Sequence, residues 1–153
     1  MKEWNDNPNK QQVDLIVEPI RVGIMPQLNG KLKDNQATRI YSVEGKSVTQ
    51  NANGGGWGAK TGLYAIPTNN PIYEVKSGFI TIKGKQYPIK LANGYYNIRK
   101  LTVAECKRLQ TVPEWYDFPV SNAQAYKMLG NGWTVDVIAH ILKSIFDSQS
   151  KGE

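Results

Sequence analysis

Short runs of hydrophobic residues alternate with polar ones through the first two thirds of the chain. Four such runs, IYEVK, FITIK, QYPIKL and YYNI, lie within residues 72–98, and Ser-Gly, Gly-Lys and Asn-Gly pairs separate them. Short runs rich in β-branched and aromatic residues are typical of strands, and dipeptides that contain glycine between them are typical of tight turns. The pattern therefore predicts a β-meander over residues 72–98.

The same pattern predicts further extended segments before the meander. They are residues 38–45 (TRIYSVEG, ending in a Glu-Gly turn), 46–52 (KSVTQNA) and 59–67 (AKTGLYAIP). Residues 13–28 also alternate, but Pro19 and Pro26 limit them to short extended pieces. The glycines of NGGGWG at 53–58 argue against regular structure there, because glycine loses more backbone conformational entropy than other residues when it is ordered.

The last third of the chain changes to helical patterns. Thr102 and Glu105 form a capping box, and Ser121 and Gln124 repeat its spacing before a helix that we expect to end at Gly130. A third helix is predicted by an apolar stripe at helical spacing, made of Val135, Ile138, Ile141, Leu142 and Ile145. The fold class is therefore α+β, with strands first and helices last.

Composition narrows the class of protein. The chain has 153 residues, 40% of them hydrophobic, and a net charge of +6. A basic chain favours a polyanion such as nucleic acid, although a merely basic protein is about as common. We find neither an apolar run long enough to span a bilayer nor a signal peptide, so we expect no membrane partner and a cytoplasmic location. The single Cys106 and single His140 argue against a disulfide or a metal site.

Cys106 could be a nucleophile or a core residue. A nucleophilic cysteine needs an exposed position and a lowered pKa. Val103, Cys106 and Leu109 instead follow one another at core spacing on a predicted helix. A buried structural thiol is therefore the favoured interpretation.

The glycine-rich segment 54–62 (GGGWGAKTG) also leaves two interpretations. It is not a phosphate-binding loop, because Ala59 stands where that motif needs a glycine directly before Lys-Thr. Trp57 and Lys60 could bring the loop against DNA. The alternative is an ordinary glycine-rich hairpin tip, and spacing alone favours that alternative.

Two long stretches carry a resemblance. Residues 99–141 contain RKLTVAECKRLQ and SNAQAYKMLGN, and residues 36–64 contain QATRIYS and GGGWGAKTGLY. The first resembles the last two conserved blocks of DNA (cytosine-5)-methyltransferases of bacteria and phages, and the second resembles their target-recognition region. The matching positions of the first stretch are Arg99, Leu101, Thr102, Glu105, Arg108, Leu109, Gln110, Ser121, Gln124, Tyr126, Lys127, Gly130 and Asn131.

The resemblance implies roles for individual residues. Arg39 matches the arginine that reads the DNA target, and Gln36 is placed like the side chain that fills the space left by a flipped cytosine, although Ala37 and Thr38 differ from the usual loop. The full set of implied DNA-binding residues is Gln36, Arg39, Gly54, Gly55, Gly56, Trp57, Lys60 and Thr61. The residues implied at the S-adenosylmethionine pocket are Gly130, Asn131, Gly132 and Trp133. Thr102, Glu105 and Arg108 are implied to be scaffold.

The chain lacks the residues that carry the chemistry of that family. It contains no Phe-x-Gly-x-Gly, no Pro-Cys and no Glu-Asn-Val. We therefore expect no catalytic residue and no methyl transfer by this chain alone. Two hypotheses remain: a target-recognition subunit that binds double-stranded DNA and completes a catalytic half on a separate chain, or a stand-alone DNA-binding module or remnant.

The expected organisation follows from that resemblance. Residues 1–30 are a lead-in and hinge, 31–98 a β-rich recognition region, 99–147 helical blocks that dock on the catalytic domain, and 148–153 a tail. In this interpretation the meander at 72–98 is a variable insert, and the helices would complete a Rossmann-like methyltransferase domain.

Overall fold

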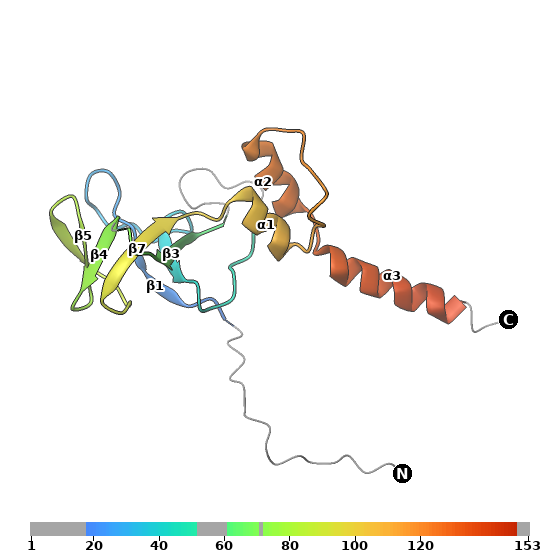
Figure 1. The fold of residues 1–153 in the computed structure, drawn as a ribbon, viewed down its shortest axis with the longest axis horizontal. Helices are drawn as coiled ribbons and strands as arrows, with labels where there is room; N and C mark the ends of the chain where they lie inside the picture. Colours follow the sequence, from blue (N-terminus) through green and yellow to red (C-terminus); the bar gives the residue numbers. More distant parts are fainter. Residues whose placement is uncertain (1–17, 52–60, 71, 150–153) are drawn as a thin grey trace, which may run out of the picture.

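A computed structural model describes residues 18–51, 61–70 and 72–149. In these ranges a seven-stranded sheet comes first and three helices follow (Figure 1). This arrangement confirms the α+β class. The glycine-rich loop predicted at 53–58 lies outside the described residues.

The sheet is mixed and its strands do not follow chain order. The strands are β1 (Arg21–Ile24), β2 (Arg39–Ser42), β3 (Leu63–Pro67), β4 (Tyr73–Lys76), β5 (Phe79–Ile82), β6 (Lys85–Pro88) and β7 (Gly94–Arg99). Their order across the sheet is β1-β2-β3-β7-β4-β5-β6. Only the β2–β3 pair is parallel among these strands.

The meander prediction is correct for three strands and wrong for the fourth. β4, β5 and β6 pair in sequence as antiparallel hairpins. β7 does not continue beyond β6 but returns to the middle of the sheet, between β3 and β4. It buries Tyr96 and Ile98 there. Turn residues predict that two strands are antiparallel neighbours, whereas the return of β7 depends on which surface its apolar face covers.

The two edges of the sheet approach each other. Gly23 of β1 forms a bridge with Ile89, which follows β6, and Lys90 N donates to Val22 O at 2.7 Å. A Cβ on Gly23 would lie 3.0 Å from the Ile89 side chain, so glycine permits this close approach. The curled sheet surrounds one core, made of Val22, Met25, Ile40, Leu63, Ala65, Val75, Ile80, Tyr87, Ile89, Tyr96 and Ile98.

Three expectations about local structure are corrected. Residues 46–51 form no strand; Tyr64 OH instead accepts from Val48 N at 3.0 Å. The helix expected to end at Gly130 is α2 (Asn122–Asn131), and it ends one residue later, with Gly132 as its cap in an extended conformation. Leu109 is 44% exposed and so lies outside the core face on which the sequence places it.

The predicted helix starts are confirmed. α1 (Val103–Leu109) begins at Thr102 with the complete capping box, and the Ser121 side chain caps α2 by accepting from Gln124 N. The two helices pack around a small second core. Its buried members are Cys106, Tyr126 and Leu129.

α3 (Val135–Gln149) extends away from the rest of the molecule (Figure 1). Val135 N donates to Gln110 O and Asp136 N to Thr111 Oγ1, so its first turn is tied to the residues that follow α1. The predicted apolar stripe is largely exposed, for example Ile141 at 46% and Ile145 at 49%. Among the described residues, no helix is long and apolar enough to cross a membrane.

Candidate nucleic-acid interface

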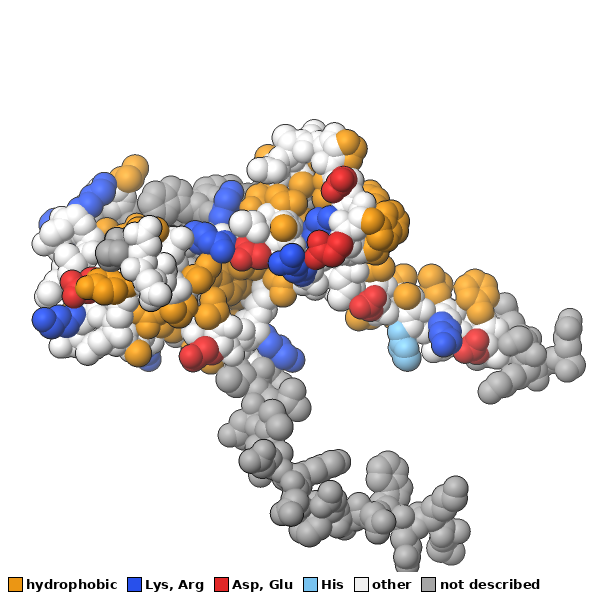
Figure 2. Space-filling view, in the orientation of Figure 1, with side chains coloured by type: hydrophobic (Ala, Val, Ile, Leu, Met, Phe, Trp, Pro, Cys, Tyr) orange, Lys and Arg blue, Asp and Glu red, His pale blue; other side chains and the backbone are white. Residues whose placement is uncertain are grey.

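Positive charge is concentrated in the sheet and its loops. Over the described residues from 18 to 100, eleven Lys and Arg stand against four Asp and Glu, whereas from 101 to 149 four stand against five. Figure 2 shows basic side chains over the β part and at its junction with the helices, and apolar side chains along α3. A polyanion would therefore be attracted to the sheet part rather than to the helices.

Arg39 begins β2 and belongs to a three-residue ion cluster. Its Nε donates to Asp34 Oδ1 at 2.7 Å, while Arg21 of β1 donates to Asp34 Oδ2 at 2.8 Å. The hydrogen bonds from Arg39 and Arg21 hold the pKa of Asp34 below its usual value. Asp34 in turn raises the pKa of Arg39, and Tyr41 adds a smaller effect in the same direction. Asp34 and Arg39 thus favour each other's charged forms.

The loop before β2 is folded against itself. Arg39 N donates to Asn35 O at 3.1 Å and Thr38 N to the same oxygen at 3.0 Å, while the Thr38 hydroxyl donates to Lys33 O. Met25 N donates to Thr38 O at 2.7 Å, which ties the loop to the end of β1. These bonds hold Asp34 beside the first residue of β2.

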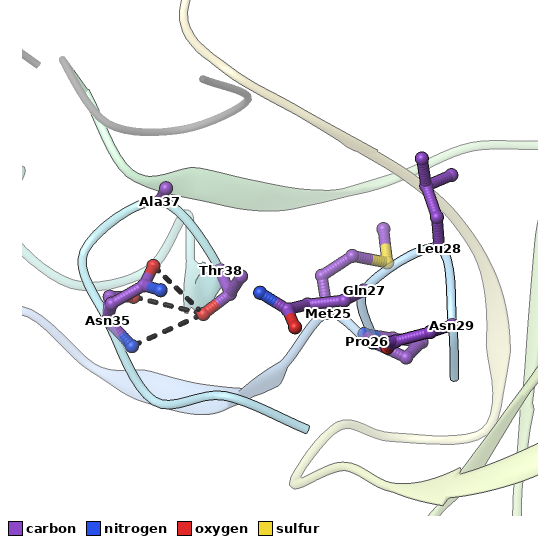
Figure 3. A pocket seen from close by; sticks show the side chains of 8 residues that line it. All are labelled: Met25, Pro26, Gln27, Leu28, Asn29, Asn35, Ala37 and Thr38. Atoms are coloured by element: carbon purple, nitrogen blue, oxygen red, sulfur yellow. Dashed lines mark hydrogen bonds between the residues drawn. The ribbon is translucent and has the colours of Figure 1, made fainter. Parts of the chain in front are cut away.

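A pocket of about 430 Å³ lies under the same loop. Figure 3 shows Met25 and Leu28 on one side and Asn35 and Thr38 on the other, with hydrogen bonds joining the last two. Leu28 itself is 85% exposed. The turn after β1 thus presents an apolar side chain next to the expected recognition residues.

Gln36 lies at a second, larger cavity. This cavity has a volume of about 680 Å³ and is lined by Gln36, by Gly130 and Asn131 at the end of α2, and by residues 48–51. Residues expected to face the flipped base and the cofactor therefore share one hollow, although they are far apart in sequence.

Thr61 is the one predicted member of the second recognition loop that the structure describes. Its side chain is buried, at 2% exposure; its hydroxyl donates to Gly62 O at 3.0 Å and accepts from Leu101 N at 3.3 Å. Thr61 thus joins β3 to the segment before α1, and a direct contact with DNA would require this joint to open. Gly54, Gly55, Gly56, Trp57 and Lys60 lie outside the described residues.

The expected cofactor residues surround the end of α2. Gly130 and Asn131 are the last two residues of the helix, and Gly132 N donates to Met128 O at 2.9 Å. A Cβ on Gly132 would lie only 3.3 Å from Met128 O, which favours glycine at this position. Trp133 is 74% exposed and lines a small apolar pocket with Met128.

Cys106 is a core residue. Its exposure is 0%, and burial raises the pKa of its thiol to about 11. A nucleophilic thiol needs the opposite shift, so the structural interpretation is confirmed. His140 is exposed on α3, and the described residues contain no group of three or more His, Cys, Asp or Glu that could hold a metal ion.

Glu105 connects the sheet to the helices. Its two oxygens accept from Arg99 NH1 and NH2 at 2.8 and 2.9 Å, and one of them also accepts from Thr102 N at 2.7 Å. The hydrogen bonds from Arg99 are the main reason that the pKa of Glu105 falls to about 2. The expected scaffold role of Thr102 and Glu105 thus has a physical basis.

Sequence analysis did not identify Asp34 or Arg21 as site residues. Asp34 lies in a polar loop and Arg21 in a segment expected to be a lead-in, and neither lies in a stretch that carries the resemblance. An acidic residue five positions before a proposed recognition arginine was the available signal. Its meaning depends on a tertiary contact.

Comparisons with known protein sequences show to which family the chain is related. A family profile described as C-5 cytosine-specific DNA methylase matches residues 5–147. Type II methyltransferase M.HhaI of Haemophilus parahaemolyticus is 33% identical over 129 residues, which cover 84% of this chain and 29% of that protein. M.AluI of Cellulosimicrobium cellulans is 50% identical over 46 residues, 29% of this chain and 9% of its own length. M.NlaX of Neisseria lactamica is 45% identical over 49 residues, 32% and 16% respectively.

The matched segments cover less than a third of each of these relatives. In this chain, by contrast, the family profile covers nearly the whole sequence, including the sheet, α1, α2 and most of α3. The chain belongs to the C-5 cytosine-specific DNA methylase family.

Proposed function

We propose that this chain is the target-recognition and C-terminal part of a DNA (cytosine-5)-methyltransferase. It binds double-stranded DNA sequence-specifically and completes the S-adenosylmethionine pocket of a catalytic half that a separate chain supplies. The observation that carries the proposal is the family match over residues 5–147 in a sequence without the Pro-Cys nucleophile or the glycine-rich cofactor motif.

Charge and geometry support the DNA-binding role. The excess of basic residues falls on the sheet and its loops, where Arg39 and Gln36 also lie. A guanidinium donates two parallel hydrogen bonds to the O6 and N7 of guanine, which is the commonest specific contact in the major groove. In this proposal Arg39 reads a guanine, and the surrounding lysines contact phosphates.

The end of α2 suits one edge of a cofactor site. The Asn131 amide can donate and accept hydrogen bonds, Gly132 leaves the backbone accessible, and the exposed Trp133 ring offers a flat apolar surface. These groups match the polar and planar parts of S-adenosylmethionine, which supplies the methyl group when bound. They form one wall, so the remaining walls belong to the catalytic half.

The helical part supports docking on that half. The stripe along α3 exposes Ile141, Leu142 and Ile145, and apolar side chains aligned on one helix face normally pack against a partner. In this proposal α3 completes a Rossmann-like catalytic domain. Residues 31–98 are the recognition region and 99–147 the docking blocks.

A stand-alone DNA-binding module is the second candidate. The sheet has its own core of eleven buried residues, so it could fold and bind DNA without a partner. The two candidates differ in what α3 does. A chain that needs a catalytic half should associate with it through α3, whereas a stand-alone module should be a monomer.

Co-expression tests the proposal. The reading frame directly upstream of the Met1 codon is sequenced, and any frame with Phe-x-Gly-x-Gly and Pro-Cys is expressed with and without this chain. Bisulfite sequencing of the host DNA should reveal methylated cytosines at one sequence only when both chains are present. Methylation by the upstream frame alone, or by this chain alone, would refute the division of labour. If no such frame exists, the stand-alone module is the better account.

A further inference from the structure

We infer that Asp34 is a positioning residue for base recognition, which holds one side of the Arg39 guanidinium and so presents its two terminal nitrogens as a fixed pair of donors. This inference rests on the proposed function, because it assumes that Arg39 reads DNA. It adds a residue outside the two stretches, 36–64 and 99–141, on which the sequence analysis bases the resemblance.

The first support is the atom that Asp34 contacts. Its Oδ1 accepts from Nε of Arg39, not from the terminal nitrogens. Guanine recognition by arginine uses a pair of parallel N–H donors. A carboxylate on the Nε side restricts rotation of the guanidinium while leaving that pair to the partner.

The second support is the way in which Asp34 is itself held. Its other oxygen accepts from Arg21 on β1, the strand that pairs antiparallel with β2. The Asn35–Thr38 hydrogen bonds close the loop immediately after it. The carboxylate is therefore fixed from the neighbouring strand and from its own loop, as a positioning group must be.

The third support is charge. One carboxylate faces two guanidinium groups, so the cluster keeps a net positive charge toward an anionic partner. The three side chains are also exposed, at 39% for Arg21, 46% for Asp34 and 36% for Arg39. Exposed ion pairs contribute little to stability, so stability alone is a weak reason for building this cluster.

The experiment measures which DNA sequences the purified full-length chain selects. The wild type and the variants Asp34→Ala, Asp34→Asn and Arg39→Ala are incubated with a randomised duplex library, and the bound DNA is sequenced. Glu44→Ala is the matched control, because it removes the same charge from the exposed turn after β2. Affinity for a fixed unrelated duplex is measured in parallel.

Asp34→Ala and Glu44→Ala should both bind the unrelated duplex somewhat more tightly, because each loses a negative charge. Only Asp34→Ala should lose discrimination at one guanine position, by about 5- to 150-fold, the range of a single bidentate contact. Asp34→Asn keeps an oxygen that accepts from Nε and should retain part of the preference. In the Arg39→Ala background, Asp34→Ala should change discrimination no further.

Three results would overturn the inference. One is an unchanged preference in Asp34→Ala while Arg39→Ala loses it. Another is an equal loss with and without Arg39. The third is an Arg39 Nε–H signal in the NMR spectrum that is identical in wild type and Asp34→Ala, which removes the acceptor; this measurement needs no DNA. If the wild type binds no duplex at all, the proposed function itself fails, which is a different outcome.

Discussion

Replacing Glu105 with glutamine should weaken the joint between the sheet and the helices. The substitution keeps size and helix propensity but removes the charge that binds Arg99 through two hydrogen bonds and Thr102 through a third. The pKa of Glu105 lies at about 2 instead of 4.5. Taken at face value, that difference corresponds to ~3 kcal/mol of folding free energy at ~1.4 kcal/mol per pH unit.

Solvent reduces that figure. The side chains of Arg99 and Glu105 keep 35% and 33% of their surface exposed, and water screens a pair of this kind. We therefore expect Glu105→Gln to lower the free energy of unfolding by about 1–2 kcal/mol near neutral pH. The sign of the pH dependence is fixed, because the folded state lowers the pKa of this acid. The contribution is complete above pH 4.5 and is lost as the pH falls toward 2.

Urea unfolding followed by circular dichroism measures this effect. The difference between wild type and Glu105→Gln should be largest at about pH 7 and less than half as large at about pH 3. Glu114→Gln is the control, because the Arg108–Glu114 pair makes one contact and is 68% and 76% exposed. That variant should not change stability measurably. If Glu105→Gln does not change the unfolding free energy at neutral pH, or changes it equally at both pH values, Glu105 does not stabilise the joint between the sheet and the helices through its charge.

Three other perturbations have defined outcomes. Cys106 should react with a thiol reagent much more slowly in the native chain than in the chain unfolded by urea, because its pKa is about 11 and its exposure is 0%. Equally fast reaction in the two states would contradict its burial. Gly62→Ala should lower the unfolding free energy by about 2–3 kcal/mol, and the control Gly84→Ala by only about 1 kcal/mol. Both glycines have positive φ, but only at Gly62 would an added Cβ approach a ring, that of Tyr41, at 3.0 Å. Equal melting temperatures of the two variants would therefore contradict crowding at Gly62. Ile141→Lys should reduce self-association of the lone chain in sedimentation experiments, because it places a charge on the exposed apolar stripe of α3. The control His140→Lys, on the polar flank of α3, should leave self-association unchanged. A wild type that is monomeric at all concentrations would argue against a partner for this stripe.

The sequence predicted those parts of the fold that depend on neighbouring residues. The capping box of Thr102 and Glu105 and the hairpins of β4, β5 and β6 need only local spacing and turn chemistry, and all of them are present. The return of β7 between β3 and β4 depends on packing across the whole sheet, so local signals missed it.

The candidate site shows the same division. Arg39 and Gln36 are proposed as site residues because the stretch around them resembles the recognition region of the family, and their roles stay predictions. The contact of Asp34 with Arg39, and the hollow that brings Gln36 to the end of α2, arise only when distant segments meet.

The most direct test of the account compares the affinity of the purified chain for two duplexes. One carries the sequence that the chain enriches from a randomised library, and the other is a shuffled version of it. At roughly physiological salt the first should bind at least about tenfold more tightly, and both affinities should fall as salt rises. Equal affinities for the two duplexes would contradict a role in target recognition, whatever the resemblance of the chain to methyltransferases.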